Sequence, residues 1–310
     1  MKKAYSMVSN IEKSAVELLE SNNIKVVINN SKTKPTDKEL VCLLMEYDIL
    51  IIGVENKISK EMLRFIKTPK IIATLSSGLD HIDEEVLYSD IIKVINIKTA
   101  NALSVAEHIF ALILALNKRI YESNSLVIDS KANRQNIHER CEEISNKTLG
   151  LIGGGNIAKE VVKIAKAFNM KIKCYTKDVK SSQVLLDYEV EFVTLDNLLK
   201  NCDIISVSIP LTAKTKFLIS ADKILLMKKT ATFINTSRRD VVDTNALIEY
   251  SKKHSTFYVG LDIDVGDYKD LFSKYRNNVI VTPHTAGSSK QAIGRIDNEL
   301  ASNIVRYLKE

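Results

Sequence analysis

Residues 148–158 read Thr-Leu-Gly-Leu-Ile-Gly-Gly-Gly-Asn-Ile-Ala, an apolar run that ends in three consecutive glycines. The pattern predicts a strand, a turn and an apolar-periodic helix, and a second strand at 172–175 completes a unit of about 30 residues. Gly153 would allow the tight turn, Gly155 would let the backbone approach a ligand, and Ala158 would let the helix pack closely on the strand. Glycine-rich turns are common, but in this order of elements they predict a dinucleotide-binding fold.

The helix that follows the glycines begins where a dinucleotide would place its pyrophosphate. Free backbone N–H groups and the helix dipole favour an anion at a helix N-terminus. We therefore take Gly153, Gly155, Asn156 and Ile157 as cofactor-binding residues. The expected ligand is a nicotinamide or flavin dinucleotide.

The composition is that of a globular protein. The chain has 310 residues, enough for two domains that each bury a core. Its 45% hydrophobic and 26% charged residues are ordinary values. The net charge of +6 comes from lysines spread along the chain beside nearly as many acids, which predicts a solvated surface and no nucleic-acid site.

Cysteine use and the apolar runs indicate the compartment. The four cysteines have no paired or metal-ligand spacing, so we expect reduced and mostly buried thiols. No apolar segment follows the basic residues of the N-terminal Met-Lys-Lys-Ala-Tyr-Ser, so we expect no signal peptide. The longest apolar run, 109–116, is too short to span a bilayer. These features predict a cytoplasmic protein that binds no membrane.

Strand-like and helix-like segments alternate along the chain. Short apolar runs, typical of buried parallel strands, predict strands in the first hundred residues at 25–28, 48–53, 71–75 and 91–95. Helices are expected there at 11–20, 38–45 and 60–67. Further strands are expected at 149–152, 171–175, 191–193, 204–208, 232–235, 258–262 and 279–281, and a last helix at 290–308. The alternation predicts an α/β protein with two doubly wound parallel sheets.

A long apolar helix is predicted from Ser104 to Ile120. Ser104 and Glu107 fit a capping box, in which each side chain satisfies a free N–H group at the helix start. The helix is apolar on almost every side, so it is buried either in a core or against another subunit.

Three segments each end a predicted strand and carry functional side chains. They are 233–243 (Phe-Ile-Asn-Thr-Ser-Arg-Arg-Asp-Val-Val-Asp), 260–267 (Gly-Leu-Asp-Ile-Asp-Val-Gly-Asp) and 281–287 (Val-Thr-Pro-His-Thr-Ala-Gly). Ligands of open α/β sheets bind beyond the carboxyl ends of the strands. We therefore expect these segments to line one site.

With these segments the chain resembles the D-isomer-specific 2-hydroxyacid dehydrogenases, the family of glycerate, hydroxypyruvate and phosphoglycerate dehydrogenases. The resemblance covers nearly the whole chain, because three more motifs match in the family's order. They are 76–83 (Ser-Ser-Gly-Leu-Asp-His-Ile-Asp), 104–108 (Ser-Val-Ala-Glu-His) and 209–212 (Ile-Pro-Leu-Thr). The resemblance implies that backbone N–H groups at Ser76, Ser77 and Gly78 hold a substrate carboxylate. It also implies further cofactor-binding residues, namely Ser104, Pro210, Thr236 and Asp262.

The resemblance implies a catalytic set of Arg238, Asp267 and His284. His284 would give a proton to the carbonyl oxygen of a 2-oxo acid, since imidazole titrates near neutral pH. Arg238 would bind the substrate carboxylate and polarise the carbonyl, and the carboxylate would favour the charged imidazole. The plain alternatives are a strand-end histidine without a role and an ion pair between Arg238 and Asp243.

Two positions depart from the family's pattern. The family usually has Glu where this chain has Asp267, whose side chain is one methylene shorter, and Asp264 is the second choice for this role. The family often has Gly where this chain has Arg239. We expect ordinary backbone at Arg239, with the side chain reaching a neighbour or solvent.

The end of the second strand of the dinucleotide unit bears on cofactor choice. NAD enzymes place an acidic residue there, which accepts hydrogen bonds from the adenosine ribose. This chain has Thr176 and Lys177, which removes a carboxylate that would repel a 2′-phosphate and adds a cation that would attract it. The pair predicts NADP over NAD. The alternative is that Asp178 takes the acidic role.

The resemblance implies a homodimer, with the helix that starts at Ser104 at the subunit contact. A Rossmann cofactor domain would cover 100–287, and a flavodoxin-like substrate domain would cover 1–99 with 288–310. The expected reaction is reduction of a small 2-oxo acid, glyoxylate or hydroxypyruvate, to the D-2-hydroxy acid by NAD(P)H. Two alternatives stay open: a phosphoglycerate dehydrogenase of serine synthesis, and a non-catalytic NAD(P)-sensing protein like the corepressors of this fold.

Overall fold

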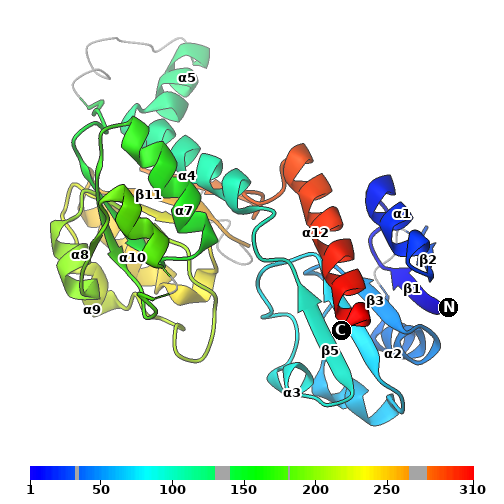
Figure 1. Cartoon of the computed structure of the whole chain (residues 1–310). Coiled ribbons are helices and arrows are strands. Elements are labelled where there is room, and N and C mark those ends of the chain that lie inside the picture. Colours follow the sequence, from blue (N-terminus) through cyan, green and yellow to red (C-terminus); the bar gives the residue numbers. More distant parts are fainter. Residues whose placement is uncertain (32–34, 130–139, 181, 265–277) are drawn as a thin grey trace. The chain divides into compact units, whose positions relative to one another are not determined.

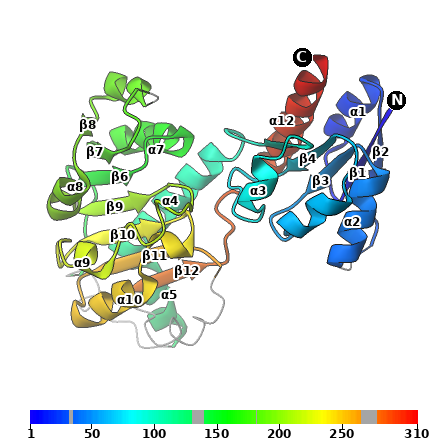
Figure 2. The same cartoon turned by 90° about the horizontal axis from the view of Figure 1, so that it is seen from below.

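The chain folds into two compact α/β units. The computed structural model describes residues 1–31, 35–129, 140–180, 182–264 and 278–310. Unit 1 consists of Met1–Asn101 and Ser289–Glu310, and unit 2 of Ala102–Ser288. Each unit contains one parallel sheet with helices on both faces (Figure 1 and Figure 2). The chain therefore passes between the units twice.

Unit 1 is built on a five-stranded parallel sheet with the order β2-β1-β3-β4-β5. The strands are β1 (Lys2–Ser6), β2 (Ile24–Ile28), β3 (Ile49–Ile52), β4 (Lys70–Thr74) and β5 (Ile92–Asn96). The helices are α1 (Lys13–Ser21), α2 (Asp37–Glu46), α3 (Glu84–Leu87), α12 (Lys290–Lys309) and the 3₁₀-helix η1 (Lys60–Phe65). This strand order is that of flavodoxin-like folds, as predicted.

Alternate residues of the central strands fill two cores on opposite faces of this sheet. Ile49 and Ile51 pack with α1 and α12, whereas Leu50 and Ile52 pack with α2, η1 and α3. All four isoleucine and leucine side chains of β3 are buried. A strand buried on both faces explains the continuous apolar run in the sequence.

Unit 2 is built on a seven-stranded parallel sheet with the order β12-β11-β10-β9-β6-β7-β8. The strands are β6 (Thr148–Ile152), β7 (Lys171–Tyr175), β8 (Glu191–Phe192), β9 (Ile204–Val207), β10 (Thr232–Asn235), β11 (Tyr258–Asp262) and β12 (Val279–Thr282). The helices are α4 (Ala102–Asn117), α5 (Ile120–Ile128), α7 (Asn156–Ala167), α8 (Leu195–Asn201), α9 (Ala221–Ile224), α10 (Thr244–Lys253) and the 3₁₀-helices η2 (Gln183–Tyr188) and η3 (Arg239–Val241). The strand order reverses between β6 and β9, which is the topology of a Rossmann domain and the crevice where such sheets bind ligands.

Helix α4 is a core element of unit 2. Most of its large apolar side chains, among them Ile109, Phe110 and Ile113, are buried against α7, β10 and β11. The sequence predicted that this helix is buried either in a core or against another subunit. In the structure it is buried in the core of unit 2 and lies along its sheet (Figure 2). Large apolar side chains are exposed instead on α5, where 72% of Ile128 is accessible.

Some boundaries differ from the prediction. Helix α4 begins at Ala102, and the Ser104 hydroxyl donates to the Ala286 carbonyl instead of capping the helix, so the capping-box prediction was wrong. The predicted helix 104–120 ends at Asn117, and Arg119 adopts a left-handed conformation before α5 begins. The predicted helix 60–67 is the 3₁₀-helix η1.

The described part of the chain contains no helix that is long and apolar enough to cross a membrane. Two of the four cysteines, Cys174 and Cys202, are buried, and burial raises the pKa of each thiol to about 12. Cys42 is exposed and Cys141 is half-buried. The described residues contain no cluster of side chains suited to a metal ion.

Candidate active site

The glycine turn leaves the N-terminus of α7 open. Gly153 has a φ of +113°, and a Cβ there would lie 2.6 Å from the Ser208 carbonyl oxygen, so the turn requires glycine. Gly155 is exposed, and no described atom lies within 4 Å of the position that its Cβ would take. The first turn of α7 carries no acidic side chain and Gly155 forms no side-chain cap. The first turn of α7 can therefore bind an anion at the helix N-terminus, which fits a dinucleotide pyrophosphate.

The end of β7 lies beside the glycine turn, because Gly153 N–H donates to the Tyr175 carbonyl at 2.9 Å. Thr176 is half-buried and its hydroxyl accepts a 3.3 Å hydrogen bond from Asp178 N–H. Lys177 and Asp178 are exposed. A hollow of about 500 Å³ opens beside Thr176, between β7 and α8.

The turn after β10 is built around the buried amide of Asn235. Its Oδ1 accepts hydrogen bonds from Ser237 N–H at 2.9 Å and from the Ser237 hydroxyl at 2.7 Å, and its Nδ2 donates to the Arg238 carbonyl at 3.0 Å. These bonds fix the backbone that carries Arg238. Asn235 was not predicted as a functional residue, although Asn followed by Ser two residues later is typical of a turn closed by the Asn side chain.

Arg238 and His284 come together from the ends of β10 and β12. Arg238 Nη1 lies 3.3 Å from His284 Nε2 and 3.2 Å from the Ser237 carbonyl oxygen. A guanidinium donates and cannot accept, so Nε2 of His284 is the acceptor in this contact. The two residues predicted to act on one substrate are thus neighbours.

A hollow of about 150 Å³ lies at this pair. Its lining residues are Leu211, Ser237, Arg238, Arg239, Asp240, Ile263, Asp264 and His284. Arg239 has no positive φ, and its Nε lies 2.9 Å from the Asp240 carboxylate, so it reaches a neighbour as expected. The predicted acid Asp267 lies outside the described residues, whereas the second choice, Asp264, lines the hollow.

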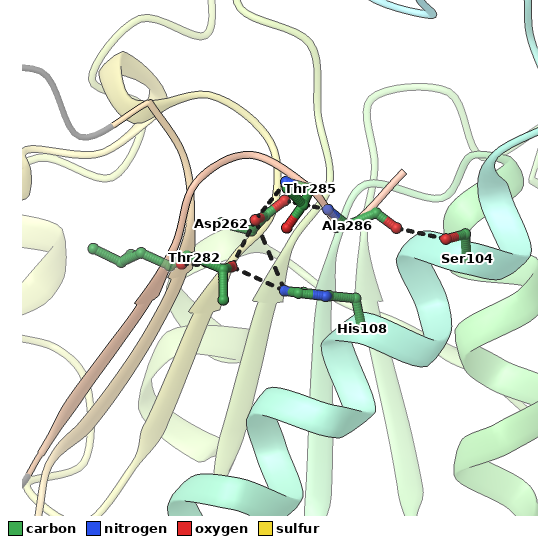
Figure 3. Close-up of polar contacts among 7 residues, drawn as sticks. Ser104, His108, Asp262, Thr282, Thr285 and Ala286 are labelled. Atoms are coloured by element: carbon green, nitrogen blue, oxygen red, sulfur yellow. Dashed lines mark hydrogen bonds and ion pairs between the residues drawn. The ribbon is translucent and has the colours of Figure 1, made fainter. Parts of the chain in front are cut away.

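The loop that carries His284 is tied to Asp262, and Figure 3 shows the hydrogen bonds that Thr285 and Ala286 make to this carboxylate. The carboxylate of Asp262 is fully buried and accepts hydrogen bonds from the Thr282 hydroxyl at 2.6 Å, from Thr285 N–H at 2.9 Å and from Ala286 N–H at 2.8 Å. Both carboxylate oxygens of Asp262 therefore accept hydrogen bonds from the segment that carries His284.

Other predicted residues of unit 2 surround the same end of the sheet. Thr236 is 7% exposed, and its buried hydroxyl has no hydrogen-bond partner among the described residues. An unpartnered buried hydroxyl is costly, so a polar group of a bound cofactor would satisfy it. The Pro210 carbonyl accepts a 2.6 Å bond from the Thr215 hydroxyl, which closes the loop after β9. Ile157, in the first turn of α7, is half-buried.

The predicted carboxylate loop belongs to unit 1, at the carboxyl end of β4. The Ser76 hydroxyl donates to the Gly78 carbonyl at 2.7 Å and lies 2.9 Å from the Thr74 hydroxyl. Asn96 Nδ2 holds the Ser77 carbonyl at 3.0 Å, and Ser77 itself is exposed. The loop is internally braced, which leaves its backbone N–H groups in a fixed arrangement.

Comparison with known proteins shows which family this chain is similar to. A family model described as "D-isomer specific 2-hydroxyacid dehydrogenase, NAD binding domain" matches residues 110–286. The chain is 33% identical to a hydroxypyruvate reductase of Thermotoga maritima over 302 residues, which is 96% of each protein. It is 32% identical to a glyoxylate reductase of Thermofilum pendens, covering 92% of this chain and 85% of the relative.

Among solved structures, a similar one is an acyclic imino acid reductase in complex with NADPH and D-Arg. The two chains are 31% identical with a TM-score of 0.87, and the match covers 100% of this chain and 97% of the other. The likeness extends over both units.

Proposed function

The chain belongs to the D-isomer-specific 2-hydroxyacid dehydrogenase family, and we propose that it reduces a small 2-oxo acid, glyoxylate or hydroxypyruvate, to the D-2-hydroxy acid. The observation that carries the proposal is the contact between Arg238 and His284 beyond the strand ends of a dinucleotide-binding sheet. NAD(P)H supplies the hydride for this reaction when it is bound. The glycine turn at 153–156 and the unsatisfied Thr236 hydroxyl fit such a cofactor.

The two side chains have complementary tasks in the reduction. A His284 that carries a proton on Nε2 cannot accept from Arg238, so protonation breaks their contact and leaves two cations side by side. A substrate carboxylate between them relieves that repulsion and accepts from the guanidinium. His284 can then donate its Nε2 proton to the carbonyl oxygen that Arg238 polarises. Substrate binding and proton loading of His284 therefore support one another.

The first experiment is oxidation of NADPH and NADH, followed by absorbance, with a panel of 2-oxo acids. The panel contains glyoxylate, hydroxypyruvate, pyruvate, phenylpyruvate and phosphohydroxypyruvate, each with and without ammonium so that imino acids are also tested. Turnover highest on glyoxylate or hydroxypyruvate supports the proposal. Tight cofactor binding without turnover on any member of the panel would overturn it and favour the sensor alternative.

Arg239 favours phosphohydroxypyruvate as a second candidate substrate. Arg239 lines the same hollow as Arg238, and its guanidinium pairs with Asp240. A second guanidinium beside the site would suit a substrate with a second anionic group. If this candidate is right, Arg239→Gly lowers activity on phosphohydroxypyruvate more than on hydroxypyruvate.

We further propose that Asp267 is the carboxylate partner of His284. Asp267→Asn should lower kcat by about tenfold or more and change the dependence of kcat/KM on pH, because the charged imidazole loses its counter-ion. Asp264→Asn is the matched control, since Asp264 lines the hollow and is the rival candidate. An unchanged pH profile for Asp267→Asn, with a changed one for Asp264→Asn, would transfer the role to Asp264.

NADP is the proposed cofactor. The supporting features are Thr176 and the exposed Lys177 at the end of β7, and NADPH is the cofactor in the similar reductase structure. Lys177→Asp should lower the ratio of kcat/KM for NADPH to that for NADH by about tenfold or more, since it replaces an attractive charge with a repulsive one. Asp178→Asn should leave the ratio high. A ratio that falls for Asp178→Asn and stays constant for Lys177→Asp would contradict the proposal.

A homodimer is also proposed, with its contact on α5, because most of the large apolar side chains of α4 are already buried and Leu103 is the main exposed one. The exposed fractions on α5 are 55% for Ile120, 48% for Tyr121, 65% for Val127 and 72% for Ile128. Burying such side chains would favour association. Val127→Glu should shift sedimentation from dimer to monomer, and a monomeric wild-type protein would refute the dimer.

A further inference from the structure

His284 occupies a backbone conformation that needs support. Its φ of +55° is left-handed, a backbone conformation that is unfavourable for a residue with a side chain. The turn is closed locally by a 3.0 Å bond from His284 N–H to the Thr282 carbonyl. Such a conformation persists where surrounding contacts hold the residues on both sides.

A chain of three groups leads from helix α4 to that loop (Figure 3). His108 Nε2 lies 2.9 Å from the Thr282 hydroxyl and 3.8 Å from the Asp262 carboxylate. The same hydroxyl lies 2.6 Å from that carboxylate and 3.3 Å from the Leu261 carbonyl. The Thr282 hydroxyl has a single hydrogen to donate. It donates to the Asp262 carboxylate, which is the nearer and charged acceptor.

The direction of every bond in the chain follows. Because the Thr282 hydroxyl donates its hydrogen bond to Asp262, it must accept a hydrogen bond from His108. Nε2 of His108 therefore carries a hydrogen. The carboxylate at the end of the chain also accepts from Thr285 and Ala286 N–H. His108 thus sets the orientation of the hydroxyl, and the hydroxyl occupies one site on the oxygen that holds the loop.

Helix α4 contacts the loop on both sides of His284. Ser104 lies one helical turn before His108 and so on the same face of the helix. Its hydroxyl donates to the Ala286 carbonyl at 2.7 Å, while His108 reaches Thr282. Figure 3 shows both side chains pointing from one helix toward the two ends of the loop.

We propose that His108 is a positioning residue for the proposed proton donor His284, acting through the Thr282 hydroxyl and the Asp262 carboxylate. The inference rests on the proposed function for its effect on turnover, but its effect on the loop does not need a substrate. The bland alternative is that His108 merely fills space at the edge of the core. The two ideas differ in whether the hydrogen bond or the bulk of the ring matters.

The test compares His108→Gln, whose amide can donate from about the position of the ring Nε2, with His108→Leu, which fills space without donating. In His108→Leu, kcat should fall by about 10- to 100-fold, because small misplacements of a reacting group have effects of this size. KM and the Kd for NADPH should change by less than about twofold, and His108→Gln should recover most of kcat. Wild-type kcat in His108→Leu, or equal losses in both variants, would overturn the proposal.

A double-mutant cycle with Thr282→Val tests the route. If His108 acts through Thr282, the double variant should be no slower than the slower single variant, whereas additive losses would overturn the route. Amide hydrogen exchange at Thr285 and Ala286 provides a readout in the cofactor-free protein. Exchange should be faster in His108→Leu than in wild type even if no 2-oxo acid is turned over, so the proposal can fail separately from the proposed function. Thr282→Val is close in shape and keeps the test available if His108→Leu does not fold.

Discussion

Gly153 and Gly155 stand two residues apart in one turn, and their surroundings differ. A Cβ on Gly153 would collide with the backbone oxygen of Ser208, whereas a Cβ on Gly155 would meet no described atom. Gly153→Ala should therefore destabilise the protein by at least about 2 kcal/mol, by strain and by steric overlap. Urea unfolding measures this loss.

Gly155→Ala should separate ligand binding from stability. Its free energy of unfolding should stay within about 1 kcal/mol of wild type, because the methyl group has room. The Kd for NADPH should rise by about tenfold or more, because the methyl group would stand where the pyrophosphate approaches. Titration of cofactor fluorescence checks this, and an unchanged Kd would show that the pyrophosphate does not approach Gly155.

Among single residues, the sequence predicted those that stand in a recognisable local motif. Arg238 and His284 stand in recognisable segments, and the structure brings them to 3.3 Å. From the sequence, His108 was interpreted as structural, because its partner Thr282 is 174 residues away and helical periodicity does not identify the partner of a polar side chain. The buried Asp262 network depends on the same long-range approach of two strands.

Helix α4 approaches β11 closely at Gly260. A Cβ there would lie 2.7 Å from Ile234 Cδ1 and 3.2 Å from Leu112 Cβ. Gly260→Ala should destabilise the protein by about 1–3 kcal/mol, since the packed helix and strands must move apart. Chemical denaturation measures the change.

The matched control is Gly294→Ala in α12. A Cβ there would lie 3.5 Å or more from Glu12, an ordinary contact, and alanine is a better helix former than glycine. This variant should be neutral or more stable by up to about 1 kcal/mol. Equal destabilisation of both variants would rule out helix packing as the reason for Gly260.

Most buried elements could be predicted because local pattern and tertiary burial agree in them. The strand β3 is a continuous apolar run, and a short run of this kind is typical of a strand that is buried on both faces of a sheet. The strand β1 was missed, because it begins with Lys2 and Lys3 and buries only small residues, Ala4 and Ser6. Its pairing with β2 and β3 is a tertiary effect that its own five residues do not show.

The two connections between the units are tied to each other within each unit. In unit 1, Glu299 of α12 accepts hydrogen bonds from the N–H groups of Lys98, Thr99 and Ala100 and from the Thr99 hydroxyl. In unit 2, Ser104 donates to the Ala286 carbonyl. Each crossing of the chain is thus anchored to the other crossing by a short bond on either side.

The Glu299 anchor should depend on pH. Burial pushes the pKa of Glu299 up, but the hydrogen bonds from the 98–100 segment outweigh it, and the pKa is lowered. A lowered carboxyl pKa stabilises the fold fully above the unfolded value of about 4.3 and loses that effect as the pH falls through the folded value.

Glu299→Gln should lower the free energy of unfolding by about 1–3 kcal/mol at pH 7. The difference from wild type should shrink as the pH falls from about 4.3 through the lowered pKa of folded Glu299, because wild-type Glu299 then becomes neutral as well. Urea titrations at pH 7 and at acid pH measure it. Glu17→Gln is the control, since Glu17 forms an exposed pair with Lys13 and should change stability by less than about 0.5 kcal/mol. A pH-independent difference for Glu299→Gln would contradict the anchor.

The return of α12 to unit 1 has a consequence for the order of events on the ribosome. Domains generally fold as units while the chain is being made, with N-terminal ones first. Here α12 packs on α1 and along β4 and β5, yet it is translated after the whole of unit 2. The segment Met1–Asn101 therefore cannot complete its fold until unit 2 and α12 have been synthesised. Until then, the apolar face that α12 covers stays exposed. Until α12 is made, the N-terminal hundred residues expose an apolar face of the kind that chaperones bind.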